Sequence, residues 1–312
     1  MAGTLPFAVD TVLMASGQGS QKPGMGADLL DVPEVAATFA LASDVLGRDV
    51  AALCTGGEGL DDTRNAQAAI ATLSIAIGRA LEAHGMRPDA LLGFSLGQVS
   101  ALALGGMVSD ADALRIVRER SRIMGEVADA NPGVMSAFLK GSPADVEAVC
   151  AECAQGDVLV AANYNSPAQT VVAGTPAAVE RAEAAWKERG GRASRLATSG
   201  AFHSPLMADA CEPFAAFLEG VGFNEPAVPI IGNADAAPLS AANVRQKLVE
   251  HLVSPVRFTE SVELLTAAGA TTFAEVGFGG VLSGLVKRCA PDAARPCIQD
   301  KASLEEFAAS RA

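Results

Sequence analysis

One stretch of the chain, residues 90–97, constrains the fold more than any other, and it reads Ala-Leu-Leu-Gly-Phe-Ser-Leu-Gly. Its three apolar residues predict a short buried strand, and the G-x-S-x-G pentapeptide after them predicts a sharp turn into a helix that runs through Leu104. This order is typical of a parallel α/β unit. The turn would expose the Ser95 hydroxyl as a nucleophile and the Leu96 amide as an oxyanion donor. A serine that merely caps the helix is the alternative.

Further strands and helices are predicted on both sides of this unit. A strand over 11–16 ends in the loop Gly17-Gln18-Gly19-Ser20-Gln21, and Ala-rich helices follow over 34–46 and 66–84. Strands over 228–231 and 272–276 alternate with helices near the end of the chain. These elements predict a parallel sheet, with the Gln18 loop at the same sheet edge as Ser95, where its side-chain amide is a second candidate oxyanion donor.

The segment between these two parts has a different pattern. Residues 133–200 predict strand, helix, strand, strand, helix and strand, and this βαββαβ order is the ferredoxin-like signature. We therefore expect a discontinuous large α/β domain, 1–132 and 201–312, interrupted by a small ferredoxin-like domain, 133–200.

Charge and hydropathy exclude several classes of partner. The chain of 312 residues has a net charge of −13, a field that repels nucleic-acid phosphates. No apolar run approaches the roughly 20 residues that cross a bilayer, and the first fifteen residues lack the basic start of a signal peptide. We expect a cytoplasmic protein with no nucleic-acid or membrane partner. The six cysteines predict core thiols, and we expect neither a metal site nor a cofactor.

A nucleophilic serine needs a base, and the chain has three histidines. His84 precedes the strand that leads to Ser95, so it belongs at the opposite end of the sheet. His251 suits the C-terminal end of a helix over 244–252. His203 lies in a loop where the small domain returns the chain to the large one, and clefts between domains commonly bind ligands. His203 is therefore the preferred base, and His251 is the alternative.

A charged residue interrupts the apolar face of the helix that follows Ser109. Ala113, Ile116, Val117, Ile123, Met124 and Val127 form its apolar stripe, and Arg120 occupies the position where that stripe needs a core residue. A buried guanidinium needs a partner, and its planar fork suits a carboxylate. The partner is either an internal Asp or Glu, or the carboxylate of a substrate.

These features together resemble the malonyl-CoA:acyl carrier protein transacylases and the related acyltransferase domains of polyketide synthases, over nearly the whole chain. The shared motifs are Gly17-Gln18-Gly19-Ser20-Gln21, Gly93 to Gly97, Arg120-Ser121, Asn163-Tyr164-Asn165-Ser166-Pro167, Ala201-Phe202-His203-Ser204-Pro205-Leu206-Met207, Ser254-Pro255-Val256 and Phe273-Ala274-Glu275-Val276-Gly277.

The resemblance implies an α/β-hydrolase-like large domain with a ferredoxin-like insert. It also implies transfer of a malonyl group from malonyl-CoA to acyl carrier protein, in fatty acid biosynthesis. Ser95 would be the nucleophile, His203 the base held by the His251 carbonyl, and Gln18 with Leu96 the oxyanion hole. Arg120 would bind the malonyl carboxylate, and the resemblance places four further residues at the substrate: Phe94, Phe202, Asn163 and His251.

The chain departs from the family pattern near the proposed nucleophile. Phe94 stands where the family usually has His, Gln98 where it has Glu, and His251 where it has Gln. Phe278 replaces a common Pro. Two alternatives stay open: a serine esterase or thioesterase that uses the same nucleophile with water as acceptor, and, because of Phe94, a catalytically idle scaffold that binds a carrier protein.

An acidic carrier protein would need a local basic face. Two groups are candidates, and scattered solubilising charges are an equally good interpretation. The groups are Lys187 with Arg189, Arg192 and Arg195, and Lys287 with Arg288.

Overall fold

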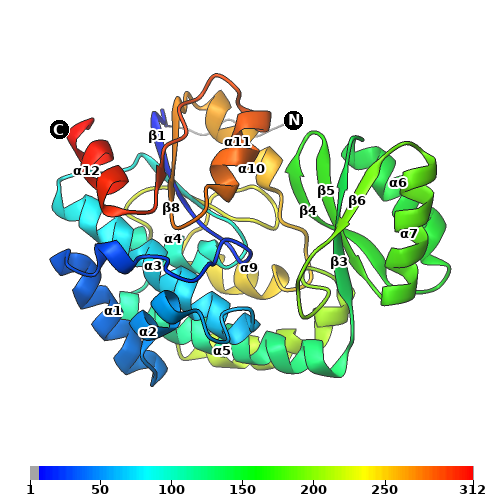
Figure 1. The fold of residues 1–312 in the computed structure, drawn as a ribbon, viewed down its shortest axis with the longest axis horizontal. Coiled ribbons are helices and arrows are strands. Elements are labelled where there is room, and N and C mark those ends of the chain that lie inside the picture. Colours follow the sequence, from blue (N-terminus) through cyan, green and yellow to red (C-terminus); the bar gives the residue numbers. More distant parts are fainter. Residues whose placement is uncertain (1–6, 312) are drawn as a thin grey trace.

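The computed structural model describes residues 7–311, so residues 1–6 and 312 of the predicted large domain lie outside the described residues. Its strands form one parallel and one antiparallel sheet. In Figure 1 the antiparallel sheet, with α6 (Pro143–Ala154) and α7 (Pro176–Glu188) beside it, lies to the right of the parallel sheet and its helices.

The parallel sheet has five strands in the order β7-β2-β1-β8-β9. These strands are β1 (Thr11–Ala15), β2 (Ala90–Gly93), β7 (Ile230–Ile231), β8 (Thr272–Val276) and β9 (Cys297–Ile298). The first four correspond to predicted strands. Strand β9 was not predicted, because two residues are too few to show a period.

Helices cover both faces of this sheet because the strands are apolar on both faces. Leu13 and Ala15 pack into a core with the helices α1 to α5, whereas Val12 and Met14 pack on the other face against α10 and α11. The bounds of the helices are α1 (Pro33–Leu46), α2 (Val50–Gly56), α3 (Thr63–Ala83), α4 (Gly97–Leu104), α5 (Asp110–Ala130), α8 (Cys211–Glu219), α9 (Val244–Glu250), α10 (Phe258–Ala267), α11 (Val281–Cys289) and α12 (Lys301–Ala309).

The antiparallel sheet has four strands in the order β4-β5-β3-β6. They are β3 (Val134–Leu139), β4 (Leu159–Ser166), β5 (Gln169–Gly174) and β6 (Arg192–Arg195). One face packs on α6 and α7, where Phe138 stacks on Trp186 and both Cys150 and Cys153 are buried. The other face joins the main core through residues such as Met135 and Ala173. The observed fold is thus mixed α/β, with helices on a parallel sheet and a second, antiparallel sheet.

Backbone pairing also joins the antiparallel sheet to the segment between α9 and α10. Asn163 of β4 forms an isolated parallel bridge with Val256. The Tyr164 amide donates to the Val256 carbonyl at 2.8 Å, and the Val256 amide donates to the Ala162 carbonyl at 2.9 Å. This pairing holds the segment between α9 and α10 against the antiparallel sheet.

Candidate active site

Ser95 lies at a strained turn between β2 and α4. Its φ of 51° is in the left-handed region that side chains other than glycine rarely adopt. Glycines on each side make the turn feasible: a Cβ on Gly97 would lie 2.1 Å from the Ala15 carbonyl oxygen, and one on Gly93 would lie 2.1 Å from the Gln98 nitrogen. The predicted sharp turn is therefore present, and it leaves the Ser95 side chain half-buried at the carboxyl end of the parallel strands.

His203 contacts the hydroxyl directly. Its Nε2 lies 2.7 Å from Ser95 Oγ, and its Nδ1 lies 2.8 Å from the carbonyl oxygen of His251. A carbonyl oxygen only accepts, so Nδ1 carries the proton and Nε2 presents a lone pair to the serine. His84, in contrast, follows α3 and precedes β2 at the other end of the sheet. The structure thus brings His203 to Ser95 and leaves His84 away from it.

The His203 ring is kept neutral by its surroundings. Burial, and then the positive charge of Arg120, lower the pKa of His203 to about 4. The ring of His251 stacks on it with 4.6 Å between centroids. Burial, and then the charges of His203 and Arg120, hold the pKa of His251 well below its usual value. Near pH 7 the His203 imidazole is therefore available to accept a proton.

Arg120 is 4% exposed and contacts the same hydroxyl. Its Nη2 lies 3.3 Å from Ser95 Oγ, and its Nη1 donates to Gln67 Oε1 at 2.7 Å. Burial lowers the pKa of Arg120 to about 10, so the guanidinium stays charged near neutral pH. Within residues 7–311 no carboxylate forms an ion pair with Arg120. A buried cation without a protein carboxylate is suited to bind an anionic ligand group beside the serine.

Two further groups face the same sheet edge. Gln18 follows β1, is half-buried, and accepts a 2.9 Å hydrogen bond from the Thr63 hydroxyl through its Oε1. The side-chain amide nitrogen of Gln18 is therefore directed away from that contact. The Leu96 amide, next to Ser95, has no hydrogen-bond acceptor in the part of the chain that the structure describes. Both N–H groups remain to bind a ligand oxygen.

Asn233 holds the turn at Ser95 through hydrogen bonds to its backbone, and the sequence alone did not predict this role. Its Oδ1 accepts from the Ser95 amide at 2.7 Å, and its Nδ2 donates to the Gly93 carbonyl at 2.6 Å. Its own amide donates to Gln98 Oε1 at 2.7 Å. Gln98, which stands where the resembling family usually has Glu, thus accepts from the Asn233 amide through a neutral amide oxygen. The available signal was the position of Asn233 two residues after β7, the neighbour of β2.

The remaining predicted substrate residues are buried or half-buried against other parts of the protein. Phe94 is half-buried and packs edge-to-face on Phe258, with 5.6 Å between ring centroids. Phe202 is buried in the main core and approaches Gly200, while Asn163 is buried at the bridge to Val256. Phe94 therefore adds an apolar surface rather than a polar contact beside Ser95.

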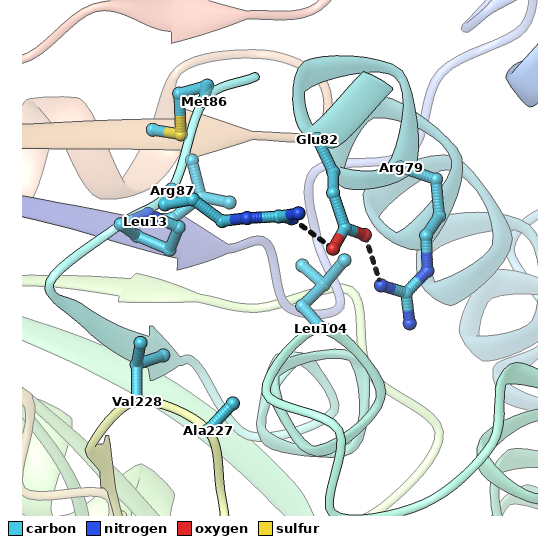
Figure 2. Close-up of a pocket in the computed structure, with 10 residues that line it drawn as sticks. Leu13, Arg79, Glu82, Met86, Arg87, Leu104, Ala227 and Val228 are labelled. Atoms are coloured by element: carbon cyan, nitrogen blue, oxygen red, sulfur yellow. Dashed lines mark hydrogen bonds and ion pairs between the residues drawn. The ribbon is translucent and has the colours of Figure 1, made fainter. Parts of the chain in front are cut away.

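A cavity lies elsewhere, near the amino ends of β2 and β7 (Figure 2). It has a volume of about 140 Å³ and is lined by residues such as Leu13, Met86 and Val228. Figure 2 shows the guanidinium groups of Arg79 and Arg87 on the single carboxylate of Glu82. Ser95 follows the carboxyl end of β2, whereas this cavity lies at the amino end of β2, so the cavity is separate from the serine centre. Its charged side chains are also already paired with one another.

Three side chains of the predicted basic groups have partners within the protein, two of them in ion pairs. Arg189 pairs with Glu152, and Arg195 pairs with Glu183 at 2.9 Å. Arg288 donates to Gln169 at 2.9 Å.

No described helix is long and apolar enough to cross a lipid bilayer.

Comparison with known proteins adds an independent observation. A family model described as the acyl transferase domain matches residues 12–299. The malonyl CoA-acyl carrier protein transacylase of Salmonella typhimurium is 40% identical over 294 residues, which cover 92% of this chain and 95% of that protein. The solved malonyl-CoA:acyl carrier protein transacylase of Xanthomonas oryzae matches with a TM-score of 0.94 and 39% identity, covering 97% of this chain and 99% of that one.

A second solved structure matches over a similar length. It is a type II polyketide synthase acyl carrier protein in complex with its malonyl-transacylase, and it matches with a TM-score of 0.93 and 38% identity. The match covers 96% of this chain and 99% of that chain.

Proposed function

This chain belongs to the acyl transferase domain family, and from that premise we propose that it transfers a malonyl group from malonyl-CoA to the phosphopantetheine thiol of acyl carrier protein. The single observation that carries the proposal is the contact of Ser95 Oγ with both His203 and the buried Arg120. This arrangement places a nucleophile, a base and a carboxylate-binding cation at one point.

The first half-reaction forms an ester on Ser95. As Ser95 Oγ attacks the thioester carbonyl, its proton moves to His203 Nε2 and the carbonyl electrons move to oxygen. Collapse of the tetrahedral intermediate breaks the carbon–sulfur bond, and His203 returns the proton to the departing CoA sulfur. The carrier-protein thiol then attacks the malonyl ester and reverses these steps. The His251 carbonyl keeps His203 in the required tautomer throughout.

The developing oxyanion is assigned to the Leu96 amide and the Gln18 side-chain amide. Both lie at the carboxyl end of adjacent parallel strands, and the Leu96 amide is at the N-terminus of α4, where the helix dipole favours negative charge. Preorganised donors of this kind commonly contribute about 10²–10³ in rate each.

Arg120 distinguishes malonyl transfer from simple ester hydrolysis. The free carboxylate of a malonyl group can accept from the guanidinium, whereas an acetyl group offers it no charged partner. We assign substrate contacts also to Phe94, Phe202 and Asn163, and to the His251 ring, which stacks on the base. A thioesterase would have no need of a cation at the acyl group, so Arg120 favours the transferase over that alternative.

We also propose the finer domain description: an α/β-hydrolase-like domain, 1–132 and 201–312, and a ferredoxin-like insert, 133–200. The strand order β4-β5-β3-β6, read in reverse as the insert's fourth, first, third and second strands, supports it. Fatty acid biosynthesis as the pathway and a cytoplasmic location complete the proposal.

Incubation with malonyl-CoA followed by intact-mass analysis tests the function. A malonyl adduct that persists and maps to Ser95 is the expected result. Rapid release of free malonate without a thiol acceptor would identify a hydrolase instead. The absence of both an adduct and released malonate would identify an idle scaffold. Ser95→Ala is the control, because it removes the nucleophile alone.

A further inference from the structure

A line of hydrogen bonds, buried except at its Gln18 end, connects Arg120 to Gln18. Arg120 Nη1 donates to Gln67 Oε1 at 2.7 Å, Gln67 Nε2 donates to Thr63 Oγ1 at 3.1 Å, and Thr63 Oγ1 donates to Gln18 Oε1 at 2.9 Å. Thr63 and Gln67 are each 1% exposed and lie one turn apart at the start of α3. The line therefore joins the proposed carboxylate-binding group to the proposed oxyanion donor, which otherwise belong to different elements.

The direction of this line is fixed at its first bond. A guanidinium has donors only, so the atom of Gln67 that faces Arg120 must be the amide oxygen. The amide nitrogen of Gln67 then faces Thr63 and donates to its hydroxyl oxygen. The identity of Arg120 as a pure donor thus determines which way the Gln67 amide points.

The same reasoning continues to Gln18. The Thr63 hydroxyl already accepts from Gln67, and its own hydrogen needs an acceptor, which Gln18 Oε1 supplies. If the Gln18 amide were flipped, two N–H groups would face Thr63 Oγ1 and the buried hydroxyl hydrogen would have no acceptor, which is costly. The bond from Thr63 therefore turns the Gln18 NH₂ group away from α3 and leaves it to bind an oxygen at Ser95.

We propose that Thr63 is a positioning residue for acyl transfer, because it holds the Gln18 amide in its oxyanion-binding orientation. In this relay, Arg120 fixes the orientation of the Gln67 amide, Gln67 fixes the Thr63 hydroxyl as a donor to Gln18, and that bond orients Gln18. This inference rests on the proposed function. It makes the first turn of α3 part of the machinery, although neither Thr63 nor Gln67 needs to touch the substrate.

Thr63→Val, which keeps the side-chain shape and removes the hydroxyl, is the test. At saturating malonyl-CoA it should slow single-turnover malonylation of Ser95 by about tenfold, because the Gln18 amide loses its fixed orientation. The KM for malonyl-CoA should change little, because Arg120 keeps Gln67 as a partner. Thr63→Ser, which retains the hydroxyl, should restore most of the rate.

The matched control is Thr72→Val on the same helix. Thr72 is fully buried, and its hydroxyl donates within the helix to the Ala68 carbonyl at 2.8 Å. This variant removes a buried hydroxyl from α3 without touching the line to Gln18, so its malonylation rate should match that of the wild type. If Thr63→Val does not fold, Thr63→Ala, which adds no atom at the site, takes its place.

A double-mutant cycle with Gln18→Ala identifies the route of the effect. If Thr63 acts through Gln18, Thr63→Val should cause little further slowing of malonylation in the Gln18→Ala background. Full additivity, or a wild-type rate for Thr63→Val alone, would overturn the relay while leaving the transferase assignment intact. Failure of the wild-type protein to form any malonyl adduct would overturn the proposed function, and the relay with it.

Discussion

Arg120 is a buried cation whose partners in the described chain are neutral. It donates to an amide oxygen of Gln67 and to the hydroxyl of Ser95, and neither of these returns a full charge. A guanidinium in this position is costly to bury, and a ligand carboxylate would offset that cost. The same charge also lowers the pKa of His203, which keeps the base unprotonated until the serine proton reaches it.

Replacing the Arg120 guanidinium should weaken the use of malonyl-CoA as a substrate. We expect Arg120→Ala to lower kcat/KM for malonyl-CoA by roughly a hundredfold, because the malonyl carboxylate would enter a buried site without a charged partner. Steady-state transfer to acyl carrier protein measures the effect. Arg122→Ala, which removes an exposed arginine of the same helix, is the control and should leave the rate unchanged. Undiminished malonyl transfer by Arg120→Ala would contradict the assignment of Arg120 as the group that binds the malonyl carboxylate.

The base should give the reaction an unusually acidic pH dependence. Because the pKa of His203 lies near 4, its neutral form persists well below the range of an ordinary histidine. We expect the rate of Ser95 malonylation, measured after rapid pH-jump mixing, to fall with a midpoint near pH 4 as the pH is lowered. A midpoint near 6.5, the ordinary histidine value, would show that burial and Arg120 do not act on this ring as described.

At the scale of the element, the turn between β2 and α4 is held by close backbone packing. We expect Gly97→Ala to destabilise the protein by about 3 kcal/mol or more, because the added Cβ would lie 2.1 Å from the Ala15 carbonyl oxygen. Urea unfolding measures this change. Gly284→Ala in α11 is the control: its Cβ meets nothing within 4 Å, so a helix-interior alanine should instead stabilise by about 1 kcal/mol. Equal stability of the two variants would contradict the packing account.

Helices and strands with a clear pattern of apolar residues could be predicted from the sequence. The stripe of α5 placed Arg120 among apolar residues, and the structure confirms its burial. The short apolar runs likewise located β1, β2 and β8. The Thr63–Gln67 pair was missed because its signal, two polar residues four apart in an Ala-rich helix, has meaning only once the position of Gln18 is known. Long-range contacts of this kind depend on how α3 packs, which no local pattern specifies.

At the scale of the whole molecule, the two stacked histidines link stability to pH. Both are buried with a lowered pKa, so between about pH 4 and 6.5 the unfolded chain binds more protons than the folded one. Stability is therefore fully present above pH 6.5 and declines as the pH falls towards 4.

We expect the free energy of unfolding to fall between pH 7 and pH 5 by about 2 kcal/mol from His203 alone, with His251 adding in the same direction. Chemical unfolding at the two pH values measures it. His251→Gln should reduce the difference, whereas His84→Gln, which removes an exposed ring, serves as the control. A free energy that stays constant between pH 7 and pH 5 would contradict the burial of both rings.

In the proposed reaction, one malonyl group passes through Ser95 from the thiol of CoA to the thiol of a carrier protein. The most direct measurement isolates the malonyl-enzyme, adds acyl carrier protein bearing phosphopantetheine, and records the masses of both proteins over time. We predict that the enzyme loses its adduct while the carrier protein gains the same mass. Loss of the adduct as free malonate, with the carrier protein unchanged in mass, would contradict the account.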